Sequence, residues 1–209
     1  MSALYFYWTL LWVNLVFISH KGKSKGRKST KLKARRLTSL EGVERYKVKL
    51  IPHNSEWEKE FIMVRGELIK CWGANIVDIQ HVGSTAITAI CAKPILDIAV
   101  QLESIQNMDI EALTNMGYDY CGPRHGNEKY HLFVLRGCNQ MSFRHIHCYD
   151  KTEREFDLLI SFRDYLNTHI EDALRYQNIK IRLAEQYHND RNAYTQGKEE
   201  FIKEIYSRL

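Results

Sequence analysis

The sequence lacks any pair of cysteines spaced as Cys-x-x-Cys, and its cysteines are odd in number. There are five of them: Cys71, Cys91, Cys121, Cys138 and Cys148. This spacing argues against a zinc ribbon and against a scaffold held together by disulfides. Free thiols stay reduced in the cytoplasm, so the cysteines predict a cytoplasmic protein.

Acidic residues are missing from positions 21–36, which hold nine of the 30 lysines and arginines. The rest of the chain has 21 basic and 25 acidic residues, a net charge of −4, although the whole chain carries +5. The positive charge therefore belongs to one segment. We expect no specific nucleic-acid binding from the folded part.

No basic residue precedes the apolar run at residues 3–18, whereas a secretory signal has its positive charge before the run. As a helix the run would span roughly 24 Å, short of the ~30 Å core of a bilayer. Two interpretations stay open. Residues 1–40 are an apolar segment and basic linker outside the fold, or residues 3–18 contact a membrane and anchor the domain on its cytoplasmic side.

A Walker A phosphate loop is also absent. Gly22-Lys23-Ser24 fits the end of that pattern, but Phe17 stands where the pattern needs its first glycine. The segment also lacks the strand before it and the helix after it that the loop requires. Phosphate binding must be sought elsewhere in the chain.

The stretch from His81 to Val100 predicts a strand, a tight turn, a short helix and a second strand. Gly83 allows the sharp turn, and Ser84 or Thr85 can cap the helix that follows. The free N–H groups of a helix start favour a bound phosphate. Asp97 is the single charge in the second strand, where it needs a partner or a metal ion. A phosphate site followed by a carboxylate suits a nucleoside triphosphate with Mg²⁺.

The remaining pattern predicts α+β architecture, with an α/β core and a helical segment at the C-terminal end. Capping boxes at Ser55–Glu58 and Thr152–Glu155 predict two helix starts. We expect strands at 46–51, 76–82, 94–100, from 118, 130–136 and 142–149, and helices from about 56 to 72, 107 to 116, 153 to 167, 169 to 187 and 191 to 207.

His145 and His147 alternate along a late strand, so both imidazoles lie on one face within reach of a shared ligand. If that strand borders the one with Asp97, His147 takes the place of a second acid or contacts phosphate. The alternative is a pair of hydrogen-bonded surface histidines. Arg124 and His125 lie in a loop that could reach an anion.

Several motifs in order resemble the GrpB-like family over residues 46–209. The match rests on the signature of the central stretch, in which His81, Gly83, Ser84, Thr85, Ala92, Lys93, Pro94, Ile95, Asp97 and Ile98 stand at the expected positions. It continues in Phe162–Leu166, in Tyr176 with Lys180, and in Tyr194 with Lys198 and Phe201. The family is similar to nucleotidyltransferases, which implies a mixed sheet with flanking helices in a domain spanning 45–209.

The resemblance implies roles for these residues. Gly83, Ser84 and Thr85 would hold phosphates, with Lys93, Lys180 and Lys198 neutralising charge. Asp97 and His147 are the catalytic candidates, and Asp97, His145 and His147 are the metal candidates. Ala99 departs from the acid-x-acid pattern of nucleotidyltransferases and removes a metal ligand. Two functions stay open: nucleotidyl transfer from a triphosphate with Mg²⁺, and a non-catalytic nucleotide- or metabolite-binding or interaction domain.

Overall fold

The structure is a computed structural model that describes residues 40–209. Our expectations for the apolar run at 3–18 and for the basic segment fall outside this range. Within 40–209, no helix combines the length and the apolar composition that crossing a membrane requires.

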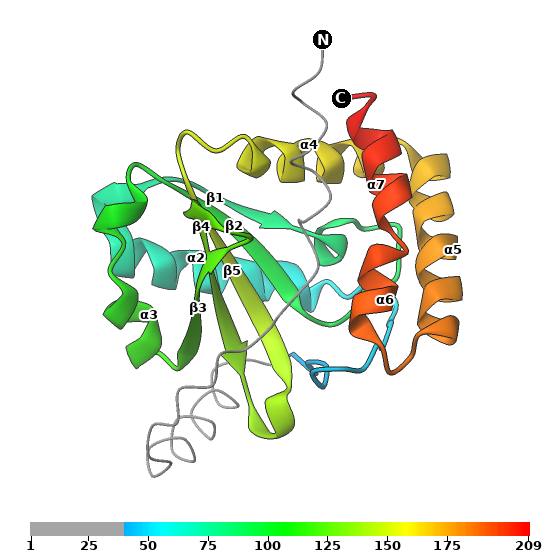
Figure 1. Ribbon diagram of the computed structural model, residues 1–209, viewed down its shortest axis with the longest axis horizontal. Helices are drawn as coiled ribbons and strands as arrows, with labels where there is room; N and C mark the ends of the chain where they lie inside the picture. The colour runs from blue at the N-terminus through cyan, green and yellow to red at the C-terminus, as the bar shows by residue number, and fades with distance from the viewer. Residues whose placement is uncertain (1–39) are drawn as a thin grey trace.

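One mixed five-stranded sheet occupies the centre of the described chain (Figure 1). Its strand order is β1-β2-β5-β4-β3, and β2 pairs with β5 in parallel while the other neighbours are antiparallel. The strands are β1 (Ile76–Val82), β2 (Leu96–Leu102), β3 (Tyr118–Arg124), β4 (Asn127–Arg136) and β5 (Ser142–Asp150). The predicted α+β class is therefore confirmed, and Asp97 lies within a strand as expected.

Helix α2 (Glu56–Trp72) covers one face of this sheet and, with α3 (Ile110–Asn115), closes the main core. The apolar residues of α2 recur at helical spacing, so they form one buried stripe. The even-numbered residues of β2 and β5 point into this core because side chains alternate along a strand. The core includes Trp57, Leu68, Ile98, Phe133, Ile146 and Cys148.

The main core also encloses a charged pair. The Arg144 guanidinium donates to the Glu60 carboxylate and to the Tyr118 hydroxyl, and both charged side chains are almost fully buried. Opposite charges removed from water stabilise each other only when both stay paired. The pair therefore fixes α2 against β5.

The opposite face of the sheet carries the odd-numbered residues of β2 and β5, among them Asp97, Ala99 and Tyr149. Helix α4 (Glu155–Thr168) packs over part of this face through Phe156 and its neighbours. The rest of the face stays open toward the C-terminal helices.

Helices α5 (Ile170–Gln186), α6 (Arg191–Gln196) and α7 (Glu199–Tyr206) form a layer beside the sheet (Figure 1). Helices α5 and α7 join α4 and the loop after β1 in a second core built on Ile87, Phe162, Tyr176 and Phe201. This arrangement places the C-terminal helices next to the turn at Gly83.

Four local expectations need correction. Residues 46–51 form no strand; only an isolated bridge joins Ile51 to Ala92. Neither capping box forms, because Asn54 accepts from the Glu56 N–H at the start of α2, and Thr152 bonds to Asp150 in a turn before α4. The helix expected over 191–207 is split into α6 and α7 at Gly197.

The described chain contributes to the core from its first residues. Leu40 is buried in the main core, and Val43 exchanges two backbone hydrogen bonds with Ser142 of β5, at 3.0 and 2.8 Å. Gly42 packs directly on the Phe143 ring, with no space for a side chain. Residues 40–43 therefore belong to the packed domain.

Candidate functional site

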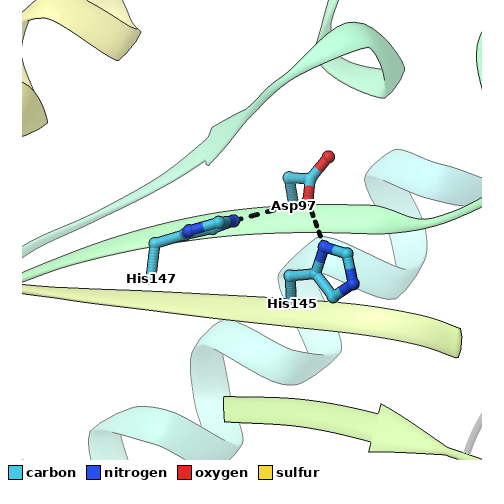
Figure 2. A group of neighbouring side chains, drawn as sticks. All are labelled: Asp97, His145 and His147. Atoms are coloured by element: carbon cyan, nitrogen blue, oxygen red, sulfur yellow. Dashed lines mark hydrogen bonds and ion pairs between the residues drawn. The ribbon is translucent and has the colours of Figure 1, made fainter. Parts of the chain in front are cut away.

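Asp97, His145 and His147 converge on the open face of the sheet (Figure 2). Asp97 Oδ1 lies 2.9 Å from His145 Nδ1 and 3.4 Å from His147 Nε2. The cause is the parallel register of β2 and β5, which pairs Asp97 with His145 and Ala99 with His147. One potential ligand atom from each residue lies within 4.8 Å of the other two. The three side chains therefore form one polar cluster.

Electrostatics keep the Asp97 carboxyl ionised. Burial alone would raise its pKa, but contacts with the His145 and His147 imidazoles outweigh burial and hold the pKa well below its usual range. Burial lowers the pKa of His145 to about 4, despite the opposing contact with Asp97. The cluster at neutral pH is thus a carboxylate beside a neutral His145 imidazole.

The turn at Gly83 packs against this carboxylate. Gly83 has a φ of 71°, and a Cβ there would lie 2.7 Å from Asp97 Oδ2. Only glycine combines that backbone conformation with so close an approach. The turn and the carboxylate therefore form one unit.

A helical turn starts at Ser84, as predicted, but it is a single 3₁₀ turn that ends at Ala86. Such a turn has too few aligned peptides to act as the phosphate-binding helix start that we expected. Thr85 is buried, and its hydroxyl contacts His81 Nε2 at 2.9 Å. Thr85 and His81 therefore support the turn from within.

Two adjoining hollows, of about 150 and 80 Å³, meet at Asp97. Both are lined by Gly83, Lys93, Asp97, His145 and Arg191. The larger hollow adds His147 and Tyr130 of the sheet and the arginines Arg45, Arg124 and Arg136. The smaller adds Ser84, Thr85, Tyr176, Tyr194 and Lys198. We call the two together the cleft.

Positive charge dominates the cleft. Among residues 40–209, Asp97 is the only acid that lines it. Six cationic residues line it as well: Arg45, Lys93, Arg124, Arg136, Arg191 and Lys198. The domain outside residues 21–36 has more acids than bases, so this excess is local. Such a site favours an anion with several charges.

Burial, with a smaller contribution from neighbouring cations, lowers the pKa values of the cationic residues Lys93, Arg191 and Lys198 in the cleft. Burial lowers the pKa of Lys198 to about 8, and that of Lys93 well below its usual value, helped by the nearby Arg191. Burial also lowers the pKa of Arg191. Asp97 opposes the shift in all three. A bound anion would also raise these pKa values, because it favours the charged forms of the lysines and the arginine.

The three predicted lysines do not all reach the cleft. Lys93 and Lys198 line it, with their ammonium groups 5.2 and 4.7 Å from the centre of the Tyr194 ring. Lys180 lines neither hollow: its ammonium donates to the Cys91 carbonyl and lies 4.9 Å from the centre of the Tyr176 ring. Lys180 is therefore a structural residue that ties α5 to the loop after Gly83, which corrects our expectation.

Arg191 is the main residue that sequence reasoning missed. It starts α6, and no hydrogen bond or ion pair holds its guanidinium anywhere in the described part of the chain. Nothing in the local sequence distinguishes it from other arginines at the start of a helix. Arg45 and Arg136 were missed as well, whereas Arg124 lines the cleft from the end of β3 and not from the loop that we expected.

Known proteins are similar to this chain. The profile of the family described as "GrpB protein" matches residues 47–208. This chain belongs to the GrpB family. It is 34% identical to the glutamate-rich protein GrpB of Alkalihalophilus pseudofirmus, over 80% of this chain and 99% of that protein. It is also 33% identical to the UPF0157 protein YqkA of Bacillus subtilis, over 75% of this chain and 46% of that protein.

Solved structures agree with the family assignment. The conserved protein GrpB from Enterococcus faecalis superposes with a TM-score of 0.70 at 26% identity, covering 77% of this chain and 96% of that one. Structures with weaker likeness include a nucleotidyltransferase, the Cid1 poly(U) polymerase bound to Mg and 3′-dATP. Its TM-score is 0.46 at 12% identity, over 82% of this chain and 53% of that one. That likeness leaves the function of this GrpB protein open.

Proposed function

We propose that this GrpB protein binds a nucleoside triphosphate in the cleft and transfers its nucleotidyl group to an acceptor. The observation that carries the proposal is the cluster of six cationic side chains around one carboxylate, in a domain that is otherwise net negative. A triphosphate supplies several negative charges on a short chain and would match this distribution.

The two hollows suit two substrates. Lys198 and Arg191 lie where they would neutralise a triphosphate in the smaller hollow, next to the Ser84 turn, with Tyr176 and Tyr194 as flat walls. The larger hollow, lined by Arg124 and its neighbours, would then receive the acceptor. Both hollows open on Asp97, so the reacting groups of two such substrates would meet there.

Mg²⁺ is the metal ion expected for such a reaction, and the residues fit it poorly. Mg²⁺ prefers oxygen ligands in octahedral geometry, whereas the cluster offers one carboxylate and two imidazoles. Ala99, the position for a second acid, is fully buried in an apolar cluster with Tyr149 and Phe156. We therefore derive no catalytic step through Mg²⁺. The cationic side chains are left to bind, orient and neutralise the phosphates.

Binding without turnover is the second candidate, and the buried Ala99 is the observation that favours it. A domain with one carboxylate in its cleft lacks the paired acids that hold two metal ions in polymerases. The two candidates share the same ligand and differ only in whether pyrophosphate is released.

Binding is tested by titrating nucleoside triphosphates into the full chain in a chelator, by calorimetry. Arg191→Met should weaken binding at least about tenfold, since it removes a charge-assisted contact. The matched control is Arg182→Met, which removes an exposed arginine of α5 outside the cleft and should leave affinity unchanged. Equal affinity in both variants would refute the site.

Pyrophosphate release then separates the two candidate functions. Release that depends on the triphosphate and falls in Arg191→Met identifies an enzyme. Tight binding with no release over hours identifies a binding domain.

A further inference from the structure

We propose that Asp97, His145 and His147 form a binding site for a transition-metal ion of the Zn²⁺ class, which discriminates against Mg²⁺. The donor set is one carboxylate oxygen and two imidazole nitrogens, each within 4.8 Å of the others. Imidazole suits Zn²⁺ and its neighbours, whereas Mg²⁺ is bound by oxygens. The metal site lies in the cleft to which we assign the proposed function, but the inference that it binds a metal ion does not depend on that function.

The three donors come from rigid elements. Asp97 lies on β2 and both histidines on β5, and every residue of β2 is paired in parallel with a residue of β5. Figure 2 shows the ring nitrogens of both histidines directed at the same carboxylate. Donors fixed by neighbouring strands lose little freedom when an ion binds, which favours affinity.

A hydroxyl group supports one of the imidazoles from behind. The Tyr130 hydroxyl oxygen lies 2.7 Å from His147 Nδ1, on the side of the ring away from Asp97. When His147 Nδ1 carries the proton and donates it to this oxygen, Nε2 presents its lone pair toward Asp97. Partners of this kind are typical of metal-binding histidines, because they fix the ring and the tautomer.

Nearby positive charges weaken the binding of any divalent cation, so the nitrogen donors must decide which ion binds. Lys93, Arg191 and Lys198 all act electrostatically on Asp97 and repel any divalent cation. Mg²⁺ binding depends on charge and on several oxygens, so one carboxylate among these cations holds it weakly. Zn²⁺ experiences the same repulsion but gains two bonds to imidazole nitrogens, which Mg²⁺ does not favour.

One side of the cluster opens on the cleft. The side chains of Asp97, His145 and His147 keep 21%, 12% and 10% of their surface exposed, and all three line the larger hollow. Three protein ligands with one open position are the pattern of catalytic rather than structural zinc sites. If the proposed function holds, a phosphate oxygen is the ligand that takes the open position.

The test uses the full chain, freed of any affinity tag, stripped with a chelator and dialysed. Zn²⁺, and separately Mg²⁺, are titrated by calorimetry with no nucleotide present, and Co²⁺ serves as a spectroscopic probe. His145→Ala and His147→Ala are compared with His131→Ala. His131 lies on β4 of the same sheet and contacts Tyr120 and the Glu128 carbonyl, away from the cluster. Circular dichroism checks that each variant is folded.

We expect one Zn²⁺ per chain, at least a tenfold loss of affinity in His145→Ala and His147→Ala, and no loss in His131→Ala. Co²⁺ should give a visible absorption band that disappears in the same two variants. Mg²⁺ at a hundredfold higher concentration should not compete. Absence of Zn²⁺ binding, equal binding in all variants, or competition by Mg²⁺ would each overturn the inference.

The nucleotide titration in chelator, with Arg191→Met, reports on the proposed function alone. The two experiments therefore distinguish a protein that binds the metal ion but no nucleotide from one that binds nucleotide but no metal ion.

Discussion

Replacing Asp97 by asparagine separates what the carboxylate does for the fold from what it does for ligands. Asparagine keeps the size of the side chain but removes its charge. Lys93, Arg191 and Lys198 then lose their only acidic neighbour in the cleft lining. Removing one partner from a buried group of charges lowers the free energy of unfolding by about 3 kcal/mol. In a domain of this size the melting temperature should fall by roughly 6–12 °C.

The same substitution should strengthen nucleotide binding when no metal is present. It removes the one negative charge that repels a triphosphate. At about 6 Å and an effective dielectric constant near 20, that repulsion amounts to about 3 kcal/mol, and solvent and salt reduce it. We therefore expect Asp97→Asn to bind a triphosphate at least about fivefold more tightly in chelator, which corresponds to about 1 kcal/mol.

Calorimetry in chelator and thermal unfolding measure the two effects on one sample. Asp164→Asn is the matched control, because Asp164 is an exposed acid paired with Arg163 outside the cleft. It should change neither quantity. Weaker triphosphate binding by Asp97→Asn in chelator would refute the reasoning, because the carboxylate would then contribute to binding without a metal ion.

Three further predictions follow from local geometry. Gly83→Ala should lower the free energy of unfolding by about 1–3 kcal/mol and weaken Zn²⁺ binding, because the new Cβ would displace the Asp97 carboxylate. The control is Gly122→Ala, which should keep its Zn²⁺ affinity because Gly122 has a nearly equal φ of 72° but open space around it. Ala99→Asp should destabilise the domain by about 3–5 kcal/mol in thermal unfolding without creating an Mg²⁺ site, since the acid would be buried among apolar side chains; a stable variant that binds Mg²⁺ would contradict this. Burial lowers the pKa of Lys180 to about 7, so the unfolded chain binds the Lys180 proton more readily than the folded chain does. The free energy of unfolding of the wild type should therefore rise by roughly 2 kcal/mol relative to that of Lys180→Met between pH 7 and 9, and parallel curves of unfolding free energy against pH would exclude the shift.

Local chemistry in the sequence was enough to predict much of the architecture. The alternation of apolar residues in β2 and β5 and the helical stripe of α2 reflect which face each element buries, and that information is carried by neighbouring residues. The motifs from His81 to Ile98 indicated the family, which residues 47–208 confirm. Asp97, His145 and His147 could be named because a charge or two histidines in buried strands need a partner.

Local rules failed where distant segments decided the outcome. The pattern at 46–51 suits a strand, but the backbone of Val48 pairs with His188 and Ile51 with Ala92, so no neighbouring strand is available. The expected Ser55 capping box does not form, because the Glu56 N–H donates to the side chain of the neighbouring Asn54 instead. Such choices depend on which partner is within reach, and the local sequence does not state that.

By itself, the sequence singled out Asp97, His145 and His147 as candidates and determined on which face of its strand each one lies. Only the tertiary structure decided which strands are neighbours, and hence that Asp97 meets both histidines through the parallel pairing of β2 and β5. It also decided that Arg191 enters the cleft while Lys180 turns away to the Cys91 carbonyl. The reason is physical: side-chain alternation is a property of adjacent residues, whereas register and helix placement minimise the free energy of contacts across the whole domain.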